Sequence, residues 1–407
     1  MANILNKEER LQKGTPGFAA RDLRATWALA LGTFAVGTDA FIVAAFLPQM
    51  AQELAVSPAV AGHSVTAFAL AYAVLAPVIA TFTSAMGRRR LLVGSLVLLG
   101  VSNMASALSW SFGVLVATRV AAAACAAAYT PNAGAVAAAL AAPEARARAL
   151  AVVIGGLTAA TALGVPIGHV VSAAMSWRAS LTVVGIVALI SATTVVCMMP
   201  RLPGGARVTL RRRLAALRRP HVLPILPLTV LGMAACYTPY AFTLEVLDAL
   251  QVPAAALTFM LFAYGAGAFL GNHISGRGTD RFGPVAILAG TYAFMTASLA
   301  TLAWFCGPQR AGLPVVASLM ACWGGSSWAQ SPAQQHRLIA SAPDEAPLVV
   351  ALNSSCIYLG ITIGTAVGAQ LIGHGASALL MCGAGLASVA LLYLLSTAAR
   401  VRTSVSN

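Results

Sequence analysis

Charge is scarce in this chain of 407 residues. Only 9% of the residues are Asp, Glu, Lys or Arg, and only 11 are acidic. A soluble protein needs far more charge than this to cover its surface. Hydrophobic residues make up 59% of the chain. The composition therefore excludes an ordinary soluble protein and indicates a chain that lies largely within a membrane.

Motifs for catalysis and metal binding are also missing. The sequence has no GxSxG, no HExxH and no phosphate-binding loop with GK[ST], so neither hydrolysis nor direct use of ATP is expected. Its seven cysteines are scattered, without a CxxC or a Cys/His cluster, which argues against a metal site or a disulfide framework. We therefore expect no enzyme activity and no cofactor. A cleavable signal peptide is not expected either, because residues 1–24 are polar and basic.

Long apolar runs recur from one end of the sequence to the other. A helix of roughly 20 apolar residues is long enough to cross about 30 Å of hydrocarbon. The runs predict twelve transmembrane helices, at about 25–50, 58–84, 91–108, 112–141, 148–174, 178–199, 223–247, 254–275, 284–305, 314–336, 347–372 and 376–399. The expected fold class is an all-α integral membrane protein.

The basic residues, which give a net charge of +14, are unevenly distributed between the predicted loops. With the amino terminus in the cytoplasm, every Lys and Arg except Arg119, Arg178 and Arg310 falls on the cytoplasmic side. By the positive-inside rule, this predicts that both termini are cytoplasmic. The basic charge therefore sets the topology and favours contact with the lipid bilayer, and no nucleic-acid partner is expected.

The longest polar interruption divides six predicted spans from six. Gly87 and Gly283 follow the second and eighth spans, and Gly164 and Gly360 lie in the fifth and eleventh, so both pairs are 196 residues apart. A shared offset at two separate places indicates a duplication. It predicts two pseudo-symmetric six-helix halves with a site between them near the bilayer midplane.

The expected organisation follows from these boundaries. It comprises a cytoplasmic N-terminal tail (1–24), an N-terminal six-helix half (25–199), a basic cytoplasmic linker (200–222), a C-terminal six-helix half (223–399) and a cytoplasmic tail (400–407). The linker is either an ordinary connection between domains or an amphipathic helix that contacts lipid.

Asp39 is the one acidic residue well inside the first apolar run. An ionisable group at that depth is costly in hydrocarbon and is by default a candidate for ion or substrate chemistry. Helix arithmetic places Asp39 roughly 21 Å from the start of its span and Arg119 roughly 10 Å from the outer end of the fourth, so the two reach similar depths. Because a buried arginine needs a partner, we expect an Asp39–Arg119 couple that binds and releases protons; a purely structural pair is the alternative.

Four further polar residues in apolar surroundings are candidates for the wall of a substrate cavity. Tyr237 and Tyr240 are three residues apart and share a helix face, although tyrosines also form belts at membrane interfaces. Gln334 and Asn353 must find partners inside the protein, either other helices or the substrate.

Two motifs support a family resemblance. The loop after the eighth span contains Gly276-Arg277-Gly278-Thr279-Asp280-Arg281-Phe282-Gly283, and the fifth span contains Gly155-Gly156 and Gly164-Val165-Pro166-Ile167-Gly168. From about residue 25 to 398 the chain resembles the major facilitator superfamily. Within it, the chain is similar to the twelve-span drug:proton antiporter branch of bacterial efflux permeases, near the arabinose-efflux-like and chloramphenicol-exporter-like proteins.

The resemblance implies roles for the motif residues and a location in the bacterial inner (plasma) membrane. Gating is implied for Gly276, Asp280, Arg281 and Gly283, together with Arg88 of the loop after the second span. The resemblance also assigns Gly156, Gly164, Pro166 and Gly168 to the antiporter motif. The glycines allow close helix packing, and the proline permits a bend. The first loop departs from the family pattern, because Ser84 stands where the motif aspartate is expected.

Asp39 and the resemblance together predict a proton-coupled antiporter that exports small amphipathic or hydrophobic compounds, such as drugs, by alternating access. Substrate would favour the deprotonated Asp39 in the inward-open state, and protonation from outside would favour release. The expected partners are a small-molecule substrate, protons and the bilayer, and the protein is expected to be a monomer. The alternatives are an exporter of a polar metabolite (sugar, nucleoside or amino acid) and a transport-dead membrane sensor.

Overall fold

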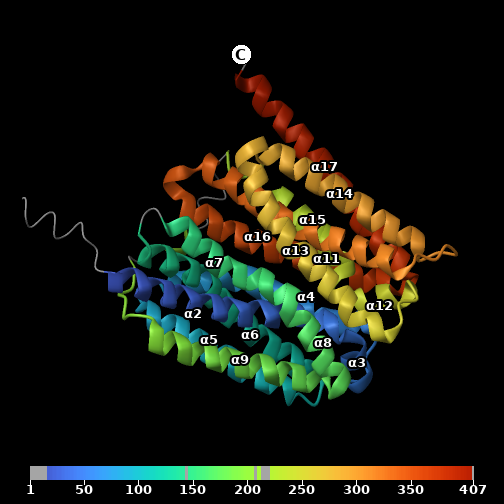
Figure 1. Ribbon diagram of the computed structural model, residues 1–407, viewed down its shortest axis with the longest axis horizontal. Coiled ribbons are helices and arrows are strands. Elements are labelled where there is room, and N and C mark those ends of the chain that lie inside the picture. The colour runs from blue at the N-terminus through green and yellow to red at the C-terminus, as the bar shows by residue number, and fades with distance from the viewer. Residues whose placement is uncertain (1–15, 143–144, 206–208, 212–220, 406–407) are drawn as a thin grey trace, which may run out of the picture.

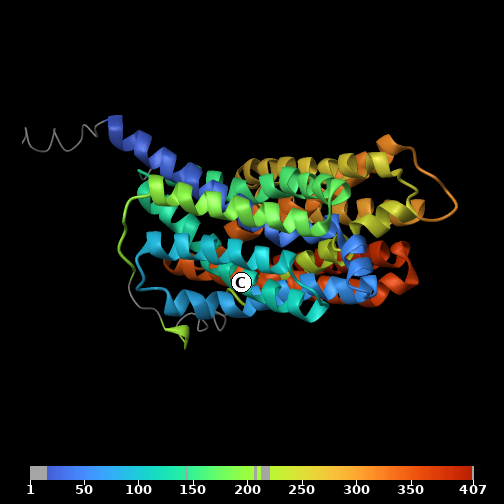
Figure 2. The same cartoon turned by 90° about the horizontal axis from the view of Figure 1, so that it is seen from below.

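The helices of the protein run side by side in one elongated bundle (Figures 1 and 2). The computed structural model describes residues 16–142, 145–205, 209–211 and 221–405. In these residues the regular structure is entirely helical, which confirms the predicted fold class. Helices α2 to α9 pack together as one half, and α11 to α17 pack together as the other.

The bounds of the helices follow the chain through the two halves. The N-terminal half contains α2 (Pro16–Phe41), the 3₁₀ helix η1 (Ile42–Ala45), α3 (Leu47–Glu53), α4 (Pro58–Phe82), α5 (Arg88–Ala107), α6 (Phe112–Leu140), α7 (Arg146–Ala159), the π-helical turn η3 (Ala160–Gly164), α8 (Val165–Ala174) and α9 (Trp177–Met198). The C-terminal half contains α11 (Leu226–Tyr240), α12 (Thr243–Ala249), α13 (Ala254–Phe282), α14 (Pro284–Phe305), α15 (Leu313–Ser341), the 3₁₀ helix η5 (Pro343–Glu345), α16 (Ala346–Leu371), the 3₁₀ helix η6 (Ile372–His374) and α17 (Ala376–Val405).

Ten of the described helical segments are long and apolar enough to cross a membrane. Helices α11 and α12, which meet at a bend of 57°, make an eleventh as one broken span. Helix α15 has 29 residues and packs between α13 and α14. It buries Ser326, Ser327, Gln330 and Gln334, and these polar residues lower its mean hydropathy. The described residues therefore contain twelve helical positions, and α15 is the one that is not apolar enough to count as a span candidate.

The duplication seen in the sequence extends to the helix boundaries. Helices α12, α13 and α14 begin 196 residues after α3, α4 and α5, respectively. The two residues other than glycine with a positive φ in the described chain, Ala55 (53°) and Gln251 (57°), are also 196 residues apart. A left-handed backbone is unfavourable for such residues and is retained only where the surrounding structure requires it. Each half therefore makes the same tight turn after its first span.

Local sequence determines where several helices begin and end. Ser57, Ser111 and Ser176 precede α4, α6 and α9, and each hydroxyl accepts a hydrogen bond from a backbone N–H of the first turn. Such caps satisfy donors that the helix leaves free. Helix α13 ends at Gly283, whose φ of 82° suits only glycine without strain, and Pro284 then begins α14.

The helices extend beyond two expected boundaries. Helix α2 begins at Pro16 and α17 continues to Val405, so helix reaches into both segments expected to be tails. The span candidates in these helices are shorter, Arg24–Ala45 and Ala376–Ala398. Most of the expected linker, including 206–208 and 212–220, lies outside the described residues. We call the end of the bundle at which α2 begins and α9 ends the terminal end, on the left in Figure 2, and the other the opposite end.

Candidate functional site

Asp39 lies in the last turn of α2, just before the chain changes to the 3₁₀ helix η1. Arg119 of α6 contacts it twice. Its Nη1 forms an ion pair with Asp39 Oδ1, and its Nη2 donates a hydrogen bond of 2.9 Å to the backbone carbonyl oxygen of Asp39. The guanidinium carbon lies 4.5 Å from the centre of the Phe68 ring. Asp39 is 0% exposed and Arg119 is 1% exposed, so the pair is sealed from solvent.

The hydrogen bonds of this ion pair are incomplete. Asp39 Oδ2 and Arg119 Nε are both buried, and neither has a hydrogen-bond partner in the described part of the protein. An unpaired buried polar atom costs about 1–3 kcal/mol, and more when the group is charged. The pair is therefore held in the bundle without all the hydrogen bonds that its two buried groups could make.

The glycines of the fifth span bring its backbone directly onto the helix that carries Asp39. A Cβ atom at Gly156, Gly164 or Gly168 would overlap atoms of the first span, and the residues it would meet range from Ala30 to Ile42. Because these positions lack side chains, α7 and α8 can lie against α2 and η1 over more than two turns. The backbone of the fifth span is thus in direct contact with the segment around Asp39.

The fifth span is also locally irregular at the antiporter motif. Residues Ala160–Gly164 form a π-helical turn, and Pro166 lies in the first turn of α8. Proline has no N–H to donate, and π turns are frequent at functional sites. Gly265 of α13 packs on this turn so closely that a Cβ there would overlap the backbone of Thr161 and Ala162. The motif is therefore a contact between the two halves as well as within one.

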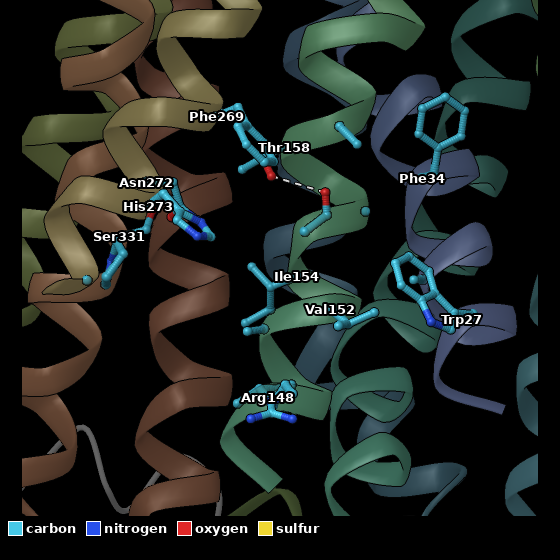
Figure 3. A pocket seen from close by; sticks show the side chains of 18 of the residues that line it. Trp27, Phe34, Arg148, Val152, Ile154, Thr158, Phe269, Asn272, His273 and Ser331 are labelled. Atoms are coloured by element: carbon cyan, nitrogen blue, oxygen red, sulfur yellow. Dashed lines mark hydrogen bonds between the residues drawn. The ribbon is translucent and has the colours of Figure 1, made fainter. Parts of the chain in front are cut away.

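A cavity of about 1230 Å³ lies between the halves and extends to the terminal end (Figure 3). Its walls come from α2, α7 and α9 of one half and from α13 and α15 of the other. Apolar side chains such as Phe34, Ile154 and Phe269 form most of the lining, and Asn272 and Ser331 add polar groups. Such a cavity is large enough for a drug-sized molecule.

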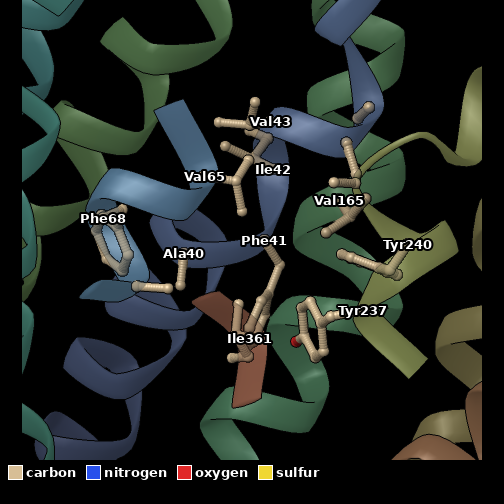
Figure 4. Close-up of a cluster of buried hydrophobic side chains, with 14 of the residues drawn as sticks. Ala40, Phe41, Ile42, Val43, Val65, Phe68, Val165, Tyr237, Tyr240 and Ile361 are labelled. Carbon is tan, nitrogen blue, oxygen red and sulfur yellow. The ribbon is translucent and has the colours of Figure 1, made fainter. Parts of the chain in front are cut away.

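Aromatic side chains separate the cavity from the opposite end of the bundle. Phe41, two turns beyond the cavity residue Phe34 on α2, lies 6.3 Å from Tyr237 and 5.8 Å from Trp328 between ring centroids. Figure 4 shows Phe41 and Tyr237 pointing toward each other from the two halves. They are 196 residues apart and so occupy equivalent positions of the two repeats. This contact closes the path along the centre of the molecule.

A second contact between the halves joins α4 and α16. The hydroxyls of Thr66 and Thr365 are 2.8 Å apart, and the rings of Tyr72 and Tyr358 stack with centroids 3.5 Å apart and planes 16° apart. The four residues lie in the halves of α4 and α16 nearer the opposite end or close to the middle of the bundle. The bundle is therefore open at its terminal end and closed at its opposite end.

The four residues expected to line a substrate cavity lie outside the wall of the large cavity in this conformation, and their role in substrate binding stays a prediction. None of them lines the large cavity. Tyr237 and Tyr240 are buried among aromatic rings, since Tyr240 packs 5.1 Å from the ring of Tyr264. Gln334 donates hydrogen bonds to the Ile225 carbonyl and to the Thr229 hydroxyl.

Thr229 connects Gln334 to the fourth of these residues. Its hydroxyl donates a 2.8 Å hydrogen bond to Asn353 Oδ1, so one buried network joins α11, α15 and α16. Interhelical hydrogen bonding, the other alternative for Gln334 and Asn353, is what the structure contains. Gln334 and Asn353 are both 2% exposed, so these hydrogen bonds replace contacts with water.

The gating candidates of the C-terminal half are at the mouth of the cavity or next to it. Gly276 and Asp280 line the cavity, and Arg281 turns away and lies over the ring of Phe282 at 5.1 Å. Asp280 forms no ion pair within the described residues. Gly283 provides the turn into α14.

The loop after the second span contacts the beginning of the linker. Arg88 donates from Nη1 to Asn132 Oδ1 at 2.9 Å and from its backbone N–H to the carbonyl of Leu202 at 3.0 Å. The backbone N–H of Gly205 donates to the carbonyl of Ser84 at 2.8 Å. Ser84, which replaces the motif aspartate, thus binds the linker through its backbone, while its hydroxyl donates to the Thr81 carbonyl of its own helix.

Sequence reasoning missed the face of α13 that lines the cavity. Phe269, His273 and Arg277 are each four residues apart and all contribute to the wall. That spacing places them on one helix face and was visible in the sequence. What the sequence did not contain was the direction of the face, since this depends on how α13 packs against the other half.

Two related six-helix halves that enclose a cavity open at one end define a membrane transporter of the alternating-access type. The chain belongs to the Major Facilitator Superfamily, which matches residues 29–365. This confirms the resemblance found in the motifs. The protein is accordingly a multi-pass membrane transporter and not an enzyme.

Several relatives align over most of the chain. The inner membrane transport protein YdhP of Escherichia coli is 30% identical over 374 residues, which cover 91% of this chain and 95% of YdhP. A chloramphenicol resistance protein of Streptomyces lividans is 30% identical over 352 residues, covering 85% of this chain and 88% of that protein. Among solved structures, a bacterial homologue of the human lysosomal transporter Spinster, in an inward-facing and occupied conformation, has a TM-score of 0.71 at 15% identity; the match covers 95% of this chain and 98% of that one.

Proposed function

We propose that the protein is a proton-coupled antiporter that exports small amphipathic or hydrophobic compounds, such as drugs, across the bacterial inner membrane by alternating access. The observation that carries the proposal is the Asp39–Arg119 pair, a carboxylate sealed inside the membrane bundle with one oxygen unpartnered. A proton taken up by this carboxylate would remove a negative charge from the interior of the bundle. Protonation also weakens its hold on Arg119, so it can change how α2 and α6 pack.

The cavity and the relatives support the nature of the transported compounds. The lining is mostly apolar, whereas a sugar would require many convergent hydrogen-bonding side chains. One relative is named a chloramphenicol resistance protein and another an inner membrane transport protein, and both align over most of this chain. These names favour efflux from a bacterial cell over uptake of a polar metabolite.

The distribution of basic residues supports the orientation. The terminal end, with Arg88, Arg89 and Arg90 at the start of α5, faces the cytoplasm by the positive-inside rule. The conformation described here is then open to the cytoplasm and closed to the outside. Substrate enters this state while Asp39 is ionised, and a proton taken up from outside in the other state favours release. The linkage is reciprocal, because each ligand binds one conformation better than the other.

Substrate-induced proton release tests this function directly. The purified protein in weak buffer is titrated with phenicols, lipophilic cations, sugars and nucleosides while pH is recorded. We expect release with an amphipathic class and none from the Asp39→Asn variant. Asp248→Asn, the same change at an exposed acid of α12, serves as the matched control and should retain release.

A second variant separates coupling from folding. Asp39→Asn leaves Arg119 buried without its charged partner and can destabilise the protein. The double variant Asp39→Asn/Arg119→Gln has a neutral pair in the same place, so it should fold and bind substrate without releasing protons. Full uphill export by Asp39→Asn in proteoliposomes would show that Asp39 is not the coupling site.

A further inference from the structure

The cavity wall carries more basic than acidic side chains. Three basic side chains line it, Arg148 from α7 and His273 and Arg277 from α13, against a single acidic residue, Asp280. Asp280 lies in the last turn of α13, at the mouth. Asp39 is sealed in its pair with Arg119 and does not contribute to the wall. The body of the cavity therefore contains no carboxylate among the described residues.

One face of α13 arranges aromatic and basic groups in order of depth. Phe269, His273 and Arg277 are separated by four residues each, so each step is about 6 Å along the helix. The Phe269 and His273 rings stack with centroids 5.7 Å apart and planes 14° apart. A molecule entering from the terminal end therefore meets a guanidinium, then an imidazole, then an aromatic ring.

The remaining walls complete a site for a molecule with two different ends. Figure 3 shows Phe269, Asn272, His273 and Ser331 on one side, Phe34 and Trp27 on the other, and Arg148 near the mouth. The apolar groups lie deeper than Arg148, since α7 begins at Arg146 and carries Ile154 two turns further in. A hydrophobic body fits between Phe34, Ile154 and Phe269, with its polar head toward the basic residues.

The cavity wall carries two guanidinium groups, from Arg148 and Arg277. Arg148 and Arg277 form no ion pair with any residue that the structure describes, and both are exposed. An arginine side chain keeps its positive charge and offers five donors arranged to fit a carboxylate or phosphate. Clefts lined by one sign of charge with apolar walls concentrate ligands of the opposite sign.

We propose that the cavity selects amphipathic compounds by the charge of their polar head, binding anionic heads best, neutral hydrogen-bonding heads next and cationic heads worst. Arg277 and His273 determine this preference, Arg148 adds to it at the mouth, and Phe34, Ile154 and Phe269 hold the apolar body. The inference rests on the proposed function, because it assigns the substrate class of the same cavity.

A matched series of ligands isolates the head group. Biphenyl-4-carboxylate, biphenyl-4-carboxamide and biphenyl-4-yl-trimethylammonium share one apolar body, and their binding to the full-length protein in a non-ionic detergent is measured by calorimetry. We expect the carboxylate to bind at least about ten-fold more tightly than the ammonium compound, with the amide between them. Arg277→Gln and His273→Gln should each reduce this ratio several-fold, and Asp280→Asn should increase it.

A charge-matched control tests whether position matters. Arg90→Gln removes the same charge at the same end of the bundle, from an exposed residue outside the cavity, and should leave the ratio unchanged. Equal binding of the carboxylate and the ammonium compound, or an equal effect of Arg90→Gln and Arg277→Gln, would overturn the proposal. So would a failure of all three compounds to bind.

Two additional readouts separate this inference from related ones. An anionic head can belong to a dissolved compound or to a phospholipid, so the titration is repeated in phosphatidylcholine nanodiscs with and without phosphatidylglycerol. Competition by phosphatidylglycerol identifies a lipid as an occupant, and unchanged binding identifies dissolved compounds; both agree with an anion-selective cavity. Proton release is recorded separately, since its absence despite anion-selective binding refutes the coupling mechanism and leaves the head-group preference intact.

Discussion

Breaking the Asp39–Arg119 pair should cost far more stability than removing it altogether. Asp39→Asn and Arg119→Gln each leave one full charge at a site that is at most 1% exposed. Removing one partner of a buried pair typically lowers the free energy of unfolding by about 3–5 kcal/mol, because the other charge is left without compensation. The double variant has no buried charge, and replacement of a whole buried pair is often nearly neutral.

The two atoms of the pair that lack hydrogen-bond partners give a magnitude for the expected coupling between the two substitutions. Asp39 Oδ2 and Arg119 Nε already lack hydrogen-bond partners, so the interactions of the native pair do not fully offset the free energy of burying its two charges. We therefore expect the double variant to be at least about 2 kcal/mol more stable than the sum of the two single effects predicts. The favourable term is the removal of two desolvated charges, and the unfavourable one is the loss of their mutual attraction.

The assay is a double-mutant cycle on the free energy of unfolding in mixed micelles, supported by the melting temperature in detergent. A cycle with Arg119→Gln and Asp248→Asn, two residues that form no ion pair with each other, is the control and should be additive. If the Asp39 and Arg119 effects also add, or if each single variant loses less than about 1 kcal/mol, the pair is not held as a buried ion pair and the reasoning fails.

Three further perturbations test the contacts that hold the halves and their loops. Gly265→Val should abolish transport, because its side chain overlaps the π turn of the fifth span, whereas Gly290→Ala, with open space around it, should transport normally and melt no lower than the native protein. Thr66→Val removes the hydroxyl contact to α16 and should shift the population toward the state open at the opposite end by a factor of about 2–10, as seen in distances between spin labels. Glu53→Ala leaves the buried Trp177 indole N–H without its 2.7 Å acceptor and should cost about 1–2 kcal/mol in unfolding free energy, with Glu53→Gln costing less; an equal cost for both would contradict a hydrogen-bond role.

The architecture could be predicted because its causes are spread over many residues. Each span needs about twenty apolar residues. Because the halves are duplicated, a glycine that packing requires in one half recurs 196 residues away in the other. Gly164 and Gly360 illustrate this: a Cβ at either one would overlap a neighbouring helix of its own half. Requirements repeated along the chain remain visible in a single sequence.

The cavity wall could not be predicted because it depends on the conformation. Tyr237 and Tyr240 share a helix face as expected, but that face meets Phe41 and Tyr264 rather than open space. In the same way Gln334 finds Thr229 on a neighbouring helix. Periodicity specifies which residues share a face, whereas the packing of the other eleven helices decides what the face meets.

The π turn in the fifth span could not be predicted from the sequence for a different reason. Pro166 predicted a bend, but a bend can be absorbed by a kink, a 3₁₀ turn or a π turn. The turn also contacts Gly265, about a hundred residues later in the chain, where a Cβ would overlap the backbone of Thr161 and Ala162. A local motif thus packs against the other half of the molecule.

The contacts that close the opposite end are weak enough for ligands to reverse. The Phe41–Tyr237 and Tyr72–Tyr358 ring pairs contribute about 0.5–1.5 kcal/mol each beyond the burial of their area, and the threonine hydrogen bond contributes about as much. Their sum is of the same order as the roughly 5.5 kcal/mol of differential binding that moves a two-state equilibrium from 1:99 to 99:1. Under the proposed function, a substrate in the cavity and a proton on Asp39 would together supply that difference. Much stronger closure would lock the transporter in one state, and much weaker closure would let the states exchange without either ligand and lose the coupling.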